Sequence, residues 1–176
     1  MIFVKYRLRL ITLIFFIISI VILYNHNVEK KLTKEDIKYI ELFIEELNIK
    51  KTNNHIDTFE NEIHFISNVH KKVLDVIVDR RGIDIKNTRE PKDLYLFRRG
   101  ECFDISRLLE KIYTYYGYDV RHLSIYEKIG KYPIINLFFK KNNDSHAISQ
   151  IYTKEGWLSI DSVSNWIGID INNQLI

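Results

Sequence analysis

Three side chains of this sequence could together perform nucleophilic chemistry: the single cysteine, Cys102, and further along the chain His146 and Asp161. A thiolate is a nucleophile, an imidazole can take the proton of the thiol, and a carboxylate can fix the tautomer of the imidazole. The alternative for Cys102 is a small buried hydrophobic residue, since free cysteines are often buried and inert. The sequence therefore contains a candidate thiol site, provided that the fold brings its three parts together.

The segment around Cys102 favours a reactive thiol. Apolar residues recur after it at helical spacing, namely Ile105, Leu108, Leu109, Ile112 and Tyr116. Gly117 then ends the predicted helix. Cys102 is thus expected in the first helical turn, near unpaired backbone N–H groups and the positive end of the helix dipole. Arg98 and Arg99 add positive charge just upstream, so we expect the thiolate to be favoured.

His146 and Asp161 are predicted to be neighbours on adjacent strands. His146 opens one strand-like segment, Asp161 lies in the next, and a tight turn at 154–156 separates the two. A hairpin about this turn pairs position 146 with the low 160s. Alternation also places Trp157, Ser159 and Asp161 on one face of their strand.

The remaining pattern predicts helices first and strands afterwards. Amphipathic periodicity predicts two helices before the cysteine helix, at about 36–48 and 57–79. The long connection at 80–97 is a candidate site-forming segment. Strand-like alternation follows the cysteine helix at 118–126, 134–139, 146–152 and 157–163. This order indicates an α+β domain in which a largely antiparallel sheet packs against the cysteine helix.

The N-terminus resembles a membrane anchor. Residues 10–24 are uniformly apolar and no charge follows until after position 28, so residues 10–28 reach about 28 Å as a helix. Lys5, Arg7 and Arg9 precede this run and favour a cytoplasmic N-terminus. A cleavable signal peptide is the alternative, although no A-x-A-like site follows. We expect an uncleaved anchor, with the main domain outside the cytoplasmic membrane, on its periplasmic or extracellular side.

Charge and composition exclude some functions. The net charge is +3, and the three cations before the apolar run account for it, so no basic field suggests a nucleic-acid partner. One cysteine cannot form an intramolecular disulfide. His64 and His70 are six positions apart and do not share a helical face, so no metal site is expected.

Four short motifs occur in an informative order: Gly100-Glu101-Cys102, Gly117-Tyr118-Asp119-Val120-Arg121, His146-Ala147 and Gly156-Trp157-Leu158-Ser159-Ile160-Asp161. Together they resemble the transglutaminase-like cysteine enzyme superfamily, which has a papain-like fold. With the predicted membrane anchor, the chain resembles the membrane-bound bacterial type of that superfamily. The resemblance covers about residues 94–163. Ile148 and Ser162 depart from the tryptophan and proline common in that family, which affects the substrate walls more than the triad.

The resemblance implies a catalytic triad. Cys102 would be the nucleophile, His146 the general base and acid, and Asp161 the orienting carboxylate. The backbone N–H of Cys102 would contribute to an oxyanion hole. The sequence does not identify a second donor; the segment 92–97, which contains Tyr95, is the place considered for it. Further candidates for the substrate cleft are Tyr95, Arg98, Arg99 and Trp157, and neither metal nor organic cofactor is required.

These expectations combine into one domain plan. We predict a cytoplasmic basic segment at 1–9, an anchor at 10–28, a helical N-terminal part at 29–93 and a catalytic core at 94–176. The core would act on an amide of a peptide or protein through a thioester, by hydrolysis or by transfer to an amine. The alternative is a catalytically inactive module that binds or assembles at the membrane; a protein partner is not identified.

Overall fold

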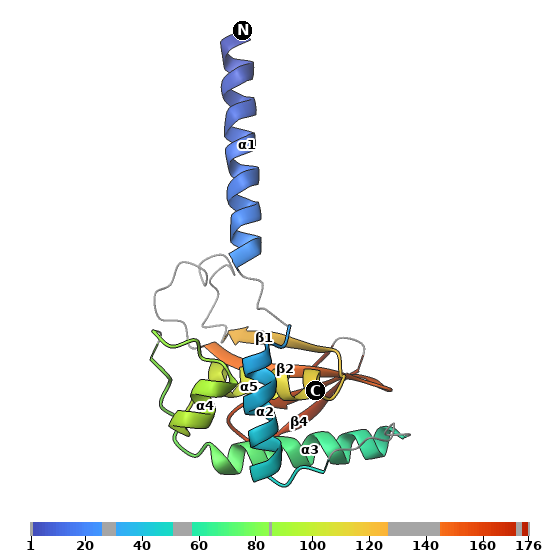
Figure 1. Cartoon of the computed structure of the whole chain (residues 1–176). Coiled ribbons are helices and arrows are strands. Elements are labelled where there is room, and N and C mark those ends of the chain that lie inside the picture. The colour runs from blue at the N-terminus through green and yellow to red at the C-terminus, as the bar shows by residue number, and fades with distance from the viewer. Residues whose placement is uncertain are drawn as a thin grey trace. The chain divides into compact units, whose positions relative to one another are not determined.

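The computed structural model describes residues 2–25, 31–50, 58–84, 86–126, 145–171 and 174–175 (Figure 1). The chain divides into two compact units, Met1–Lys31 and Leu32–Ile176. The first contains helix α1 (Ile2–Asn25), and the second contains all other helices and strands.

Helix α1 exposes apolar side chains. The large hydrophobic side chains from Leu10 to Ile18, and the side chain of Ile20, are between 48% and 72% exposed. No helix among the described residues is long and apolar enough to cross a membrane. The anchor predicted at 10–28 extends into residues 26–28, which lie outside the described part of the chain.

The helices of the second unit are α2 (Lys34–Glu46), α3 (Phe59–Val76), α4 (Pro91–Phe97) and α5 (Cys102–Tyr115). Helix α2 begins after its N-cap, Thr33, since the Asp36 N–H donates to Thr33 Oγ1 at 3.1 Å and the Thr33 N–H donates to Asp36 Oδ2 at 2.8 Å. The N-cap of helix α3 is Thr58, whose hydroxyl accepts from the Asn61 N–H. The start signal predicted at Asp57 is therefore displaced by one residue.

Helix α4 corrects the prediction of an unstructured connection at 80–97. It has 7 residues, too few to show an amphipathic period, and Pro91 stands in its first turn. Proline suits that place because its φ is already helical and its missing N–H would be unpaired there anyway. The cysteine helix, by contrast, begins at Cys102 as predicted.

The sheet is antiparallel, with the order β1-β2-β3-β4-β5. Its strands are β1 (Val120–Tyr126), β2 (Ser145–Thr153), β3 (Gly156–Asp161), β4 (Ile167–Ile171) and β5 (Gln174–Leu175). The α+β class with an antiparallel sheet is thus confirmed. The last two strands were not predicted, and the strand predicted at 134–139 lies outside the described residues.

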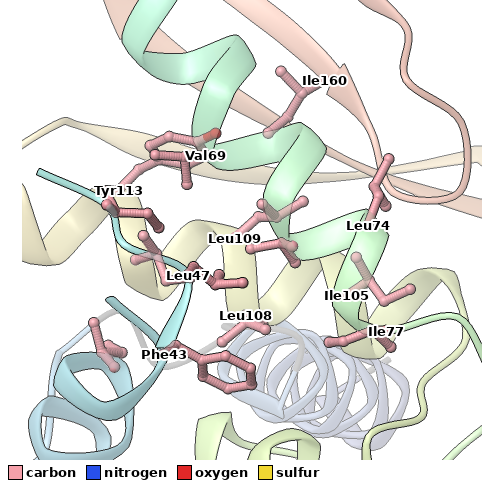
Figure 2. Packing of buried hydrophobic residues seen from close by; sticks show 14 of the residues in the cluster. Phe43, Leu47, Val69, Leu74, Ile77, Ile105, Leu108, Leu109, Tyr113 and Ile160 are labelled. Atoms are coloured by element: carbon pink, nitrogen blue, oxygen red, sulfur yellow. The ribbon is translucent and has the colours of Figure 1, made fainter. Parts of the chain in front are cut away.

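Helix α5 is the centre of the hydrophobic core. Figure 2 shows Leu108 and Leu109 of α5 in one cluster of buried hydrophobic residues with Phe43 of α2, Leu74 of α3 and Ile160 of β3. All but Leu74, which is 8% exposed, are fully buried. Burial of a leucine or phenylalanine side chain contributes about 1.5–3 kcal/mol, so this packing fixes the position of the helix that carries the cysteine.

Candidate active site

Cys102 is the first residue of α5, and its side chain is free and partly exposed. The start of the helix is held by Asp104, which is fully buried. Its carboxylate accepts from the Glu101 N–H at 3.0 Å and from the Ile83 N–H at 3.3 Å. Asp104 thus ties the turn that carries the cysteine to the segment before α4.

Arg89 also holds the turn that carries Cys102. Its Nε donates to Asp104 Oδ1 at 2.5 Å and its NH2 group to Glu101 Oε1 at 2.5 Å. The guanidinium also lies over the Phe103 ring, 4.7 Å from the centroid. At Gly100, a Cβ would stand 2.9 Å from the Asp104 Cβ, so only glycine allows this close approach. The residues on both sides of Cys102 are therefore fixed.

His146 and Asp161 lie together at one end of the sheet. His146 Nε2 is 2.5 Å from Asp161 Oδ2. Their side chains are 37% and 16% exposed, so the pair is open to solvent on the imidazole side. In the β2–β3 ladder Asp161 pairs with Ile148, which makes His146 its diagonal neighbour.

The carboxylate of Asp161 is held by further contacts. Its Oδ1 accepts the N–H groups of Val163 at 2.7 Å and Ser164 at 2.6 Å. Burial opposes ionisation, but these two donors and the His146 imidazole outweigh it, so the pKa of Asp161 lies below its ordinary value. The acid of the pair is therefore charged at neutral pH.

The thiol lies toward the same end of the sheet as His146. One turn after Cys102, the Ser106 hydroxyl is 2.7 Å from that of Ser149 in β2. Beyond the other end of α5, the Tyr152 N–H donates to the Asp119 carbonyl. Helix α5 and strand β2 thus run in the same direction, and the N-terminus of α5 lies toward the start of β2.

The alternation of side chains along β2 restricts how Cys102 and His146 can meet. Ser149 points to α5, so His146, three positions earlier, points to the opposite face of the sheet, as Asp161 does. Among the described residues, no hydrogen bond joins the Cys102 thiol to His146. Contact between thiol and imidazole has to be made around the end of β2, which begins at Ser145.

A second histidine–carboxylate pair lies on the α5 side of the sheet. His122 Nδ1 is 2.7 Å from Glu110 Oε1 and 3.3 Å from the Ser106 hydroxyl. Its ring packs edge-on against Phe103, the neighbour of Cys102, with centroids 5.3 Å apart. His122 was not singled out from the sequence. The available signal was its position on the strand face that alternation turns away from Arg121.

Two predicted cleft residues, Arg98 and Tyr95, have contacts with α2. Arg98 donates to Glu46 Oε2 at 2.6 Å, and its guanidinium lies 4.2 Å from the Tyr95 ring centroid. Tyr95 in turn packs edge-on against Phe43. These contacts account for both side chains through packing between α2 and α4.

The other two cleft candidates are placed differently. Arg99 lies over the Phe97 ring, 5.7 Å from its centroid. Trp157 shares the sheet face of Asp161 and packs against Tyr152, with the Arg121 guanidinium 4.1 Å above its ring. Trp157 is therefore the cleft candidate placed on the same face as the histidine–aspartate pair.

Among the described residues, no group of three or more His, Cys, Asp or Glu side chains could hold a metal ion. No protein-family model matches the chain, and no curated protein or solved structure shows significant similarity to it.

Proposed function

We propose that this chain is a transglutaminase-like cysteine enzyme that acts on an amide through a thioester, with Cys102, His146 and Asp161 as its triad. The observation that carries the proposal is the hydrogen bond of 2.5 Å between His146 Nε2 and Asp161 Oδ2. It joins a partly exposed imidazole to a charged and rigidly held carboxylate. A free cysteine at a helix start on the same end of the sheet supplies the nucleophile.

Each residue has a defined part in the reaction. His146 takes the thiol proton while the Cys102 sulfur bonds to the amide carbon, and the resulting oxyanion faces N–H groups at the start of α5. The C–N bond then breaks, the amine leaves with the proton from the imidazolium, and a thioester remains. Water or a second amine attacks this thioester, and the thiol is released. Asp161 stabilises the imidazolium throughout.

The substrate class is the amide of a peptide or protein. Hydrolysis and transfer share the same thioester, and the walls of the cleft decide which acceptor enters. Among the cleft candidates, Trp157 lies on the sheet face of His146 and Asp161 and could contribute to such a wall. The proposed activity is therefore that of a peptidase or amidase, or that of an acyltransferase.

The proposal is tested by the reactivity of the thiol. Iodoacetamide should modify Cys102 of the full-length protein rapidly at neutral pH, and His146→Ala should slow this at least tenfold, because a positioned base contributes about 100-fold or more. His122→Gln is the matched comparison, since its imidazole also pairs with a carboxylate but on the α5 side of the sheet. It should leave the rate within twofold.

Three results would contradict this assignment. If His122→Gln slowed labelling and His146→Ala did not, the base would be His122. If neither variant changed the rate, no histidine would activate the thiol. Labelling only after denaturation would identify Cys102 as a structural residue and favour a catalytically inactive module that binds or assembles at the membrane.

We also propose that residues 10–28 anchor the protein in the cytoplasmic membrane, with the second unit outside. The exposed apolar side chains of α1 support an apolar environment for this helix. The full-length protein should float with liposomes in a density gradient, whereas a variant with Ile14 and Ile17 both changed to Lys should not. Flotation of both proteins alike would refute anchoring by this segment.

A further inference from the structure

His70 of α3 is fully buried and contacts the candidate site. Its Nε2 lies 2.5 Å from the main-chain oxygen of Asp161. A carbonyl oxygen can only accept, so Nε2 carries the proton and donates it. Nδ1 is then unprotonated, and it is buried without a hydrogen-bond partner among the described residues.

We propose that His70 is a positioning residue, which holds the main chain of Asp161 so that the Asp161 carboxylate faces His146. This inference rests on the proposed function, since it gives His70 a part in orienting that triad. His70 touches neither the thiol nor the imidazole of His146 through any hydrogen bond among the described residues, so its effect passes through Asp161.

The place of Asp161 in the strand explains the need for such a contact. Asp161 is the last residue of β3, where the ladder to β2 ends at its pairing with Ile148. Its N–H donates to the Trp166 carbonyl, across the turn that leads to β4. A buried carbonyl at the end of a ladder needs a partner from elsewhere. His70 provides one from a different layer of the fold.

Core packing alone does not account for a histidine at this position. An apolar side chain would avoid the cost of a buried imidazole nitrogen without a partner. Burial also lowers the pKa of His70, and this outweighs the opposite effects of the Asp161 carbonyl and charge. The ring therefore stays neutral and keeps one N–H donor directed at Asp161.

Two substitutions separate the donor from the bulk of the side chain. In His70→Gln the amide nitrogen can occupy the place of Nε2 and donate to the same carbonyl. In His70→Asn the amide reaches only as far as Nδ1, so the contact is lost. His64→Asn on the same helix is the matched control, because the His64 side chain is 77% exposed.

Two measurements on the full-length protein follow. In nitrogen NMR, His70→Asn should shift the His146 side-chain signals, whereas His70→Gln and His64→Asn should leave them at the wild-type positions. In the iodoacetamide assay, His70→Asn should slow labelling of Cys102 about tenfold and change its pH profile, because a misplacement of about 1 Å can cost a factor of about a hundred. His70→Gln should restore the wild-type rate.

The failure of this inference can be told from failure of the proposed function. If His146→Ala slows labelling but His70→Asn does not, and the His146 signals are unchanged in His70→Asn, only the role of His70 is overturned. Labelling that is indifferent to His146→Ala overturns the proposed enzyme, whatever the signals show. If the His70→Asn protein does not fold, the tautomer of His70 in the wild-type protein tests the donor role. A proton on Nδ1 instead of Nε2 would refute it.

Discussion

The two carboxylate oxygens of Asp161 have different partners: Oδ2 lies 2.5 Å from His146 Nε2, and Oδ1 accepts the N–H groups of Val163 and Ser164. One oxygen thus orients the imidazole, and the other shapes the turn after β3. A purely structural aspartate would need only the second set of contacts. The two roles can therefore be separated by a substitution that preserves one oxygen.

Asp161→Asn should slow the labelling of Cys102 by iodoacetamide roughly 10- to 100-fold at neutral pH, because the neutral amide no longer stabilises the imidazolium. The amide oxygen can still accept from Val163 and Ser164, so the free energy of unfolding should fall by only about 2 kcal/mol. Labelling kinetics and urea denaturation of the same sample measure the two effects.

Ser164→Ala is the control for this prediction, since it keeps the backbone N–H that Asp161 accepts. It should change the free energy of unfolding by no more than about 0.5 kcal/mol, and the labelling rate by no more than the corresponding factor. An Asp161→Asn protein that labels at the wild-type rate would show that the carboxylate serves the turn alone.

The site was predictable as far as local patterns reach. Periodicity placed Cys102 at a helix start, and the turn at 154–156 set the hairpin that the structure confirms through the pairing of Thr153 with Gly156. The buried partners of the site were not predictable. His70 and Asp104 act through contacts that span 91 and 21 positions in the chain, and no local period reports such contacts.

The same limit applies to Arg98 and Tyr95, which were predicted to line the substrate cleft. A positive charge four positions before a cysteine suggests a role at the thiol, but Glu46 and Phe43 of α2 provide the partners. Arg98 also has a positive φ of 52°, which ends α4 and turns the chain. A helix of 7 residues is too short to be predicted from periodicity, and it reorients these side chains toward α2.

The stability of the protein should fall below pH 6.5 because of His70. The pKa of His70 is lowered by burial, so the unfolded chain binds a proton at a pH where the folded chain does not. The contribution is complete above the unfolded pKa of about 6.5 and is lost as the pH falls below it. The drop in Tm between pH 7.5 and 5.5 should be smaller in His70→Gln than in the wild type.

His64→Asn serves as the reference for this experiment, because it removes an exposed histidine from the same helix. Its Tm should follow the wild-type pH profile. Equal drops in the wild type and in His70→Gln would mean that His70 is protonated as readily in the folded chain as in the unfolded chain.

A buried ion pair between α2 and α5 should be important for stability. Lys111 and Asp36 are 2% and 3% exposed, and Nζ lies 2.6 Å from Oδ2. Lys111→Met should lower the free energy of unfolding by about 3 kcal/mol, because the Asp36 carboxylate remains buried without its cation. Denaturation in urea measures the change.

Lys92→Met is the matched control, since Lys92 pairs with Glu35 at 2.8 Å but both side chains are well exposed, at 40% and 58%. Exposed pairs contribute about 1 kcal/mol or less. Equal effects of the two substitutions would refute the distinction. Adding Asp36→Asn to Lys111→Met should recover part of the loss, because the uncompensated charge is then removed.

The contacts of Arg89 should be important both for stability and for the reactivity of Cys102. Arg89 bridges Asp104, which is fully buried, and Glu101, so that it binds one residue on each side of Cys102. Arg89→Met should cost about 3 kcal/mol, since the Asp104 charge then keeps only its backbone donors. It should also slow labelling of Cys102, because the start of α5 is no longer fixed. Arg81→Met, at a guanidinium whose side chain is 78% exposed, should leave the stability close to that of the wild type.

Arg89→Lys distinguishes charge from geometry at this anchor. The ammonium restores a positive charge near Asp104 but has no planar fork to bond two carboxylates and stack on Phe103 at once. We expect it to recover part of the stability and little of the labelling rate. Full recovery of both would mean that charge alone holds the turn, whereas a stable Arg89→Met protein with wild-type labelling would show that Asp104 needs no cation.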